Sequence, residues 1–336
     1  MSKIIKNKSN TLIILSILLL FFLLWTRKVE LAEAWVVLKT GSWGFIAVAI
    51  FMEIFFFACQ AQVYKELLKI WNANLTFPRA FAITLISSTV NKIFPSGGAS
   101  GILVFIAEIN RDGVKSEVGV LTNAVAYLLD YIAFLFVVLW GIYYLYLHSE
   151  LSRTEEVALS IFTGIIAAAF IMFVLALKNS RLFIRLIKEK FNPRHQFLVR
   201  FKKSIIEGLG TSIFLTESWG RSRWRLLTAF IAAAGMQMAD LLILYTAFKI
   251  IRYDVSPGLV AAGLALATVL SLVSMVPQGI GIYETSMTWF YLQLGVPFSI
   301  ALSVALIYRA VTFWLPILPG LISLKISRRS AYGKNT

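Results

Sequence analysis

The sequence predicts an all-α fold: a polytopic integral membrane helix bundle with an inverted repeat and two re-entrant, broken hairpins. Hydrophobic residues make up 59% of the 336 residues and charged residues 15%, and the mean hydropathy is +0.79. A soluble domain is nearer half apolar and a quarter charged. Apolar runs long enough to cross a bilayer recur along the chain. Two of these runs are interrupted by proline and glycine, which are costly inside a helix.

The N-terminal apolar run is interpreted as a signal anchor that stays in place as the first helix. Three lysines precede the uncharged residues 9–26, and the Ala-Glu-Ala at 32–34 resembles a signal-peptidase site. A cleaved signal peptide is therefore the alternative interpretation. The run is long for a signal core, and charged residues fill the space before the cleavage-like site, which favours the anchor.

The composition argues against a metal site, a cofactor and direct use of ATP. The single Cys59 lies in an apolar run, which excludes a disulfide framework or a Cys-rich metal site. His148 and His195 are far apart, so a His-ligated metal is not expected either. The phosphate-binding pattern G-x-x-x-x-G-K-[ST] does not occur in the sequence.

Each long apolar run carries very few charged residues. An ionised side chain at the bilayer centre costs about 2.5 to 3.5 kcal/mol on insertion scales, so these residues are expected to face the bundle interior. Lys92 is instead expected to snorkel toward an interface. The runs and their charges are 40–64 with Glu53, 80–107 with Lys92, 118–149 with Asp130, 157–177 with none, 226–248 with Asp240, and 255–308 with Glu284, followed by Arg309.

Basic residues predict the orientation in the membrane. Residues 178–225 contain twelve basic and three acidic residues, so this segment is expected to be cytoplasmic. Within it, RLFIRLIKEKF at 181–191 has the pattern of an interfacial helix lying on anionic headgroups. Both termini are expected on the cytoplasmic side of the plasma membrane. A nucleic-acid partner is not expected, because the basic residues lie on short loops close to the bilayer.

The run 80–107 is predicted to be a re-entrant hairpin. Its 28 residues exceed one crossing of about 20 residues but are too few for two. A single crossing would place the basic segment 178–225 outside. A hairpin that enters and leaves on the cytoplasmic side restores the positive-inside bias.

The two interrupted runs align as an internal repeat. The stretch FPSGGASG at 94–101 and the stretch VPQGIGIYE at 276–284 align with an offset of about 180 residues. A membrane span, a broken hairpin and another span then occur twice within one domain of residues 1–336. Repeat 1 covers about 43–148 and repeat 2 about 226–324. The copies enter the membrane from opposite sides, which makes the repeat inverted; chance alignment of apolar segments is the alternative.

The broken segments are predicted to form a substrate site. Non-helical backbone at membrane depth is tolerated only where protein or a water-filled cavity satisfies its polar groups. Glycine lets backbone amides approach a ligand closely, although it also permits tight helix packing without any ligand. Arg309 has a second interpretation too, as a charge that neutralises Asp130 or Glu284 in a packed core. The predicted substrate-binding residues are Gly97, Gly98, Gly101, Asp130, Asp240, Gly279, Gly281, Glu284 and Arg309.

The C-terminal motifs resemble the flippase-like family, which is the transmembrane region of lysylphosphatidylglycerol synthases. VPQGIGIYE is followed by LGV at 294–296 and YRAVTFWLPILPG at 308–320. The residues that fit the family pattern are Gly279, Gly281, Glu284, Arg309, Trp314, Pro316 and Gly320, and in the first half Asn91, Pro95, Arg111, Gly113 and Asp130. Many members carry a glutamate after the first glycine run, often with a nearby arginine, whereas SGGASG here carries neither.

The resemblance implies movement of a phosphate-containing lipid, such as aminoacylated phosphatidylglycerol, between leaflets. Twelve residues follow Leu324, so a stand-alone translocase without an aminoacyl-transferase domain is expected rather than an enzyme. Its partners would be membrane lipids and a separate lipid-modifying synthase. One alternative is a glycosyltransferase acting on a polyprenyl-phosphate lipid, although the sequence has no Asp-x-Asp. The other is a non-transporting partner of a separate synthase.

Overall fold

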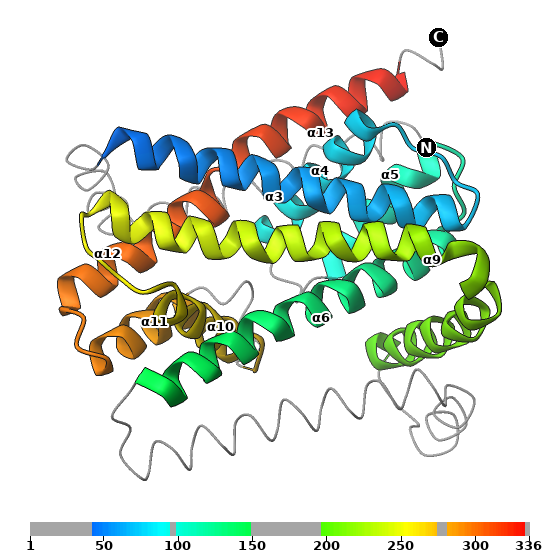
Figure 1. The fold of residues 1–336 in the computed structure, drawn as a ribbon. Coiled ribbons are helices and arrows are strands. Elements are labelled where there is room, and N and C mark those ends of the chain that lie inside the picture. The colour runs from blue at the N-terminus through cyan, green and yellow to red at the C-terminus, as the bar shows by residue number, and fades with distance from the viewer. Residues whose placement is uncertain (1–41, 95–98, 149–195, 274–280, 333–336) are drawn as a thin grey trace.

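The regular elements of the computed structural model, which describes residues 42–94, 99–148, 196–273 and 281–332, are all helices. Within these ranges there is no strand, so the predicted all-α class is confirmed. The elements are α3 (Trp43–Ile70), α4 (Phe77–Ile93), α5 (Ala99–Arg111), α6 (Ser116–His148), α9 (Gln196–Ile250), α10 (Pro257–Val273), α11 (Ile282–Gln293), α12 (Phe298–Arg309), the π-helix η2 (Ala310–Trp314) and α13 (Ile317–Tyr332). Figure 1 shows their arrangement.

Four helical stretches in the described ranges are long and apolar enough to cross a membrane. They are Trp43–Ile70, Ser116–Leu147, Ser222–Ile250 and Phe298–Arg328. Their outward faces carry large exposed apolar side chains, such as Phe51, Phe136 and Ile231. Exposed apolar surface of this extent suits lipid rather than water. The protein is therefore a multi-pass membrane protein.

The first short-helix hairpin is formed by α4 and α5, which pack against each other. Pro78 lies in the first turn of α4, where a missing N–H costs nothing. The Nε atom of Arg79, in the same turn, lies 2.8 Å from Oδ2 of Asp112, just beyond the end of α5. The hairpin thus begins and ends at the same end of the bundle, as expected for the run 80–107. Its re-entrant position in a bilayer stays a prediction.

The second hairpin is formed by α10 and α11, which lie toward the opposite end of the bundle (Figure 1). The Tyr291 hydroxyl, near the end of α11, donates to the Val260 carbonyl near the start of α10, at 3.4 Å. A Cβ on Gly263 would lie 2.3 Å from the Tyr291 ring, so this contact requires glycine. The start of α10 and the end of α11 therefore lie together at one end of the bundle, just as the start of α4 and the end of α5 do at the other.

The turns between helices repeat along the chain. Asn72 after α3 and Arg252 after α9 have φ of 58° and 59°, and they are 180 residues apart. Gly113 after α5 and Gly295 after α11 both have φ of 80°, and they are 182 residues apart. Left-handed backbone at matching helix ends supports the predicted repeat of about 180 residues. Its inversion across the membrane stays a prediction.

The long helices α3 and α9 pack antiparallel and lie side by side in Figure 1. The Ser42 amide, at the start of α3, donates to the Ile250 carbonyl at the end of α9. Further along, a Cβ on Gly235 would lie 2.9 Å from the Cys59 sulfur, so the helices approach closely. These two contacts fix which residues of α3 and α9 meet.

The helix α9 is longer than the apolar run predicted to begin at 226. It is continuous from Gln196, so the second half of the basic segment 178–225 is helical. Figure 1 shows that its N-terminal part turns away from the rest of the helix. The predicted interfacial helix at 181–191, the apolar run 157–177 and the N-terminal anchor lie outside the described residues.

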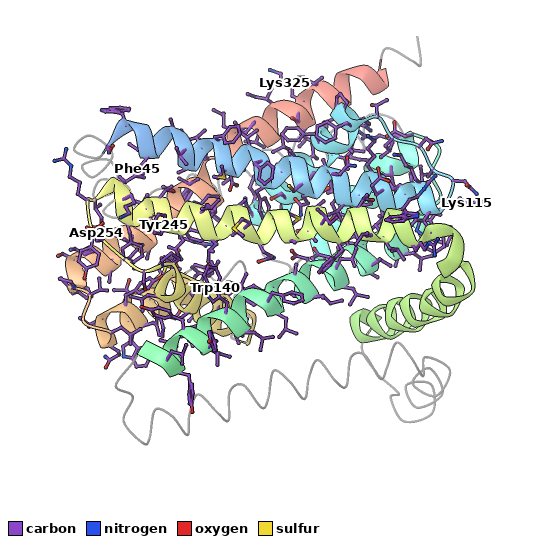
Figure 2. All side chains as sticks on the ribbon, viewed as in Figure 1. Phe45, Lys115, Trp140, Tyr245, Asp254 and Lys325 are labelled. Carbon is purple, nitrogen blue, oxygen red and sulfur yellow. The ribbon has the colours of Figure 1, made fainter. Side chains whose placement is uncertain are left out.

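The two ends of the bundle differ in charge. Figure 2 shows Lys115 at one end of the long helices and Asp254 at the other. Arg79 and Arg111 belong to the same end, because they form ion pairs with Asp112 and Glu108 where α5 ends, shortly before Lys115. By the positive-inside rule this end is expected to be cytoplasmic.

Candidate functional site

Charged side chains from six helices gather inside the bundle. This charged cluster consists of Glu53 on α3, Lys92 on α4, Asp130 on α6, Asp240 on α9, Glu284 on α11 and Arg309 on α12. Each residue is the sole charge in an apolar run, and the hairpins and long helices bring them together. An intramembrane cluster of this kind is costly unless its members interact, and it marks a functional site.

Glu284, in the first turn of α11, forms an ion pair with Arg309 at the end of α12. Arg309 Nε lies 2.9 Å from Glu284 Oε1, and each side chain is 11% exposed. The other carboxylate oxygen, Oε2, accepts the Gly281 amide at 2.7 Å. Glutamate at the third helical position thus satisfies an amide that the helix start leaves without a partner. Gly281 has φ of 85°, a left-handed conformation that side chains disfavour.

Aromatic rings hold the Arg309 guanidinium in place. Its Cζ atom lies 4.7 Å from the Phe313 ring centre and 5.4 Å from that of Tyr283. Cations are attracted to ring faces, and more strongly where water is excluded. Arg309 is therefore oriented on two sides by rings and on a third by Glu284.

A π-helix directly follows Arg309. In η2 the Leu315 amide donates to the Ala310 carbonyl, five residues back. Pro316 has no N–H, so the Thr312 carbonyl loses the donor that an α-helix would supply. Lys92 Nζ donates to that carbonyl at 2.7 Å. π-helical turns inside α-helices occur frequently at functional sites.

Lys92 lies inside the bundle, which corrects the expectation that it snorkels to an interface. Besides the Thr312 contact, its ammonium group sits 5.5 Å from the Phe57 ring centre. It also interacts electrostatically with Glu53, Arg309 and Asp240. The physical reason is the unpaired carbonyl on the neighbouring helix, which offers the ammonium group a buried acceptor.

Two tyrosines connect Arg309 with Asp240. The Tyr308 hydroxyl donates to Asp240 Oδ1 at 3.2 Å. The rings of Tyr308 and Tyr283 stack with centres 5.6 Å apart and an interplanar angle of 7°. Neither tyrosine stands out in the sequence, although each directly precedes a predicted charged residue, in YR and YE.

Asp130 is hydrogen-bonded to a side chain of α9. The Gln237 side-chain amide donates to Asp130 Oδ1 at 2.7 Å. The carboxylate also interacts electrostatically with Asp240. Of the two partners considered for Arg309, Asp130 and Glu284, the structure shows the ion pair with Glu284.

Gly101 and Gly281 are the two predicted glycines that the structure describes, and each makes a close contact within the protein. A Cβ on Gly101 would lie 3.0 Å from both Asn91 Cβ and the Ser87 carbonyl, so Gly101 permits close packing of α5 on α4. The Gly281 amide is held by Glu284. Gly97, Gly98 and Gly279 lie outside the described residues, so their part in the cradle stays a prediction.

The fold and this cluster define a class: multi-pass helical membrane proteins with charged side chains gathered inside the helix bundle. The chain matches the family described as the lysylphosphatidylglycerol synthase TM region over residues 11–320 and belongs to that family. The resemblance noted from the sequence motifs is thereby confirmed. The family connects the protein with a membrane lipid-related function.

Similar proteins occur in archaea. The chain is 25% identical to a UPF0104 membrane protein of Methanocaldococcus jannaschii, over 98% of each chain. It is also 25% identical to a UPF0104 membrane protein of Pyrococcus horikoshii, covering 95% of this chain and 97% of the relative. Both similarities therefore extend over nearly the whole membrane domain.

Proposed function

We propose that the protein is a lipid translocase, which moves a phosphate-containing lipid between the leaflets of the plasma membrane without covalent chemistry. Aminoacylated phosphatidylglycerol is one such lipid. The observation that carries the proposal is the Glu284–Arg309 pair at the N-terminus of α11. This pair lies in the membrane interior directly beside a broken segment.

The groups around Glu284 suit an anion. The first turn of α11 offers backbone amides at the positive end of a helix dipole. Arg309 offers a guanidinium, which binds phosphate in a planar, two-pronged geometry. Glu284 already uses these donors, because its two oxygens accept from the Gly281 amide and from Arg309. We infer that the Glu284 carboxylate holds the place of the lipid phosphate while no lipid is bound.

Displacement of Glu284 would also serve a cationic headgroup. Once a phosphate takes the Arg309 guanidinium, the Glu284 carboxylate is released. It then joins Asp130 and Asp240 as a partner for an amino group on the lipid. An aminoacylated headgroup carries both the phosphate and the amine, so it would use both halves of the charged cluster.

The arrangement of the hairpins suits alternating access. The two hairpins lie toward opposite ends of the bundle, and the two halves meet where α3 packs on α9, α6 on α9 and α10, and α4 on α13. Rocking of one half against the other would expose the cluster to each side in turn. The acyl chains would stay in the bilayer, so the gap would open sideways to lipid. Both termini would be cytoplasmic, with a separate lipid-modifying synthase as a candidate partner.

Lipid movement in liposomes tests the proposal. Reconstituted protein should speed the loss of a fluorescent phospholipid's signal to an impermeant quencher. Arg309→Ala should remove that gain. Arg111→Ala is the matched control, because it also breaks an Arg–Glu ion pair, with Glu108 at 2.7 Å, but at the end of α5. If wild type matches empty liposomes for zwitterionic, anionic, aminoacylated and polyprenyl-phosphate lipids, the translocase proposal fails.

A further inference from the structure

The antiparallel packing of α3 and α9 brings two carboxyl groups to the same level of the bundle. Ser42 meets Ile250 at one end of the pair, and Cys59 meets Gly235 further along. Glu53 and Asp240 lie between these contacts at equivalent positions on the two helices. Their side chains interact electrostatically, which agrees with this register.

Glu53 differs from the other carboxyl groups of the charged cluster. Asp130 accepts from Gln237, Asp240 from Tyr308, and Glu284 from Arg309 and the Gly281 amide. Glu53 is 4% exposed, and among the described residues no hydrogen bond or ion pair to its carboxyl group is present. A buried carboxylate without such a partner is costly.

The groups facing Glu53 leave negative charge in excess. Glu53 interacts electrostatically with Lys92 on α4, Asp240 on α9 and Tyr308 on α12. Asp130 interacts in turn with Asp240, and Arg309 with Lys92, while η2 and α10 bring no ionisable side chain. The charged cluster contains four carboxyl groups but only two cationic side chains. Arg309 is committed to Glu284, so Lys92 alone stands against both Glu53 and Asp240. One added positive charge would balance this trio.

We propose that Glu53, opposite Asp240 and beside Lys92, is a proton-binding site that couples lipid movement to proton movement. Two carboxyl groups close together in a water-poor interior repel each other when both are ionised, and one proton removes that repulsion. A metal ion is a poorer fit, because no group of three metal-ligating side chains occurs among the residues that the structure describes.

The coupling rests on the proposed function. Lys92 is the cation that compensates Glu53, and it lies within electrostatic reach of Arg309. A lipid phosphate bound at Arg309 would draw the Lys92 ammonium charge toward itself. Glu53 would then hold its proton more tightly while the lipid is bound, so the site would change sides with both the lipid and the proton in place. That proton would leave to water on the other side when the lipid leaves, so lipid and proton travel together.

Infrared spectroscopy tests the proton site without any transport. A protonated carboxylic acid has a carbonyl stretch that a carboxylate lacks, and it shifts in heavy water. Purified wild type at neutral pH should show this band, and Glu53→Gln should lose it. Glu66→Gln is the matched control on the same helix, because Glu66 is also buried but is paired with Lys69. A band that survives in Glu53→Gln, or its absence from wild type, overturns the proton site.

Asp240→Asn gives a second variant if Glu53→Gln does not fold. Asp240→Asn removes the negative charge that faces Glu53, so the Glu53 acid becomes easier to ionise. The infrared band should remain in this variant but disappear at a lower pH than in wild type. If Asp240→Asn leaves both the band and its pH dependence unchanged, the two carboxyl groups do not share a proton, and the proposal is wrong.

Coupling is measured in liposomes with and without a pH gradient. In wild type, the rate of lipid movement should rise when protons flow in the same direction as the lipid. The ratio of the rate of lipid movement with the pH gradient to the rate without it should fall to one in Glu53→Gln. In Glu66→Gln this ratio should stay at the wild-type value. A response to a sodium gradient instead, or no response to either, overturns the coupling. If wild type moves no lipid at all, the translocase proposal fails, while the infrared result still decides the proton site.

Discussion

The ammonium group of Lys92 lies 2.7 Å from the Thr312 carbonyl, the acceptor that Pro316 leaves without its helical donor. The two residues are 220 positions apart, one in each half of the chain. A break in one helix thus provides the polar partner for a charge on another. The contact ties the first hairpin to the last long helix through the centre of the charged cluster.

Replacing Lys92 should therefore destabilise the protein. Lys92→Met leaves a buried carbonyl without a donor, at a cost of about 1 to 3 kcal/mol, and removes the cation beside Glu53. Thermal unfolding in detergent should show a lower midpoint. The double variant Lys92→Met/Glu53→Gln should recover part of the loss, because the uncompensated carboxylate is then gone. Additive effects of the two changes would show that Lys92 and Glu53 do not interact.

The Glu284–Arg309 pair is expected to serve transport more than folding. Glu284→Gln keeps an oxygen that can accept the Gly281 amide, so α11 should still begin at the same residue. Transport should be abolished in Glu284→Gln and Arg309→Ala, while both variants insert and elute as a single species. The swap Glu284→Arg/Arg309→Glu should restore pairing without transport. Parallel loss of expression and thermal stability in both single variants would instead identify a purely structural pair.

Sequence patterns located the charged residues but not their partners. A sole charge in an apolar run is visible in the sequence, so Asp130, Asp240, Glu284 and Arg309 could be selected. The inward position of Lys92 depends on a free carbonyl far along the chain, which hydropathy does not encode. Local sequence therefore fixes which charges enter the membrane, while helix packing fixes what they contact.

The glycines show the same limit. Gly101 and Gly281 were both predicted to expose amides to a ligand, and that stays a prediction. The sequence did not indicate that Gly101 packs against Asn91 or that the Gly281 amide donates to Glu284. Tyr283 and Tyr308 were overlooked because tyrosine is unremarkable in an apolar run. Their hydroxyl partners are on other helices, so only the fold reveals them.

Gly320 should be indispensable for docking α13 on α4. A Cβ there would lie 1.9 Å from Thr89 Oγ1 and 2.8 Å from the Leu85 carbonyl oxygen, so one helix must move. Gly320→Ala is expected to lower stability by about 1 to 3 kcal/mol through overpacking. Gly44→Ala is the control, since nothing lies within 4 Å of its added Cβ. Equal melting temperatures for the two variants would contradict this packing.

The topology predicts opposite accessibility for the two ends of the bundle. In a Cys59→Ser background, single cysteines are placed at Lys115, beyond the first hairpin, and at Asp254, before the second. These residues lie at opposite ends of the long helices (Figure 2). Basic residues cluster near Lys115, so this end should be cytoplasmic. An impermeant thiol reagent added to intact cells should label Asp254→Cys and not Lys115→Cys, and permeabilised cells should allow both. Labelling of position 115 from outside would mean that the helices cross in the reverse sense, and the assignment of cytoplasmic termini would fall with it.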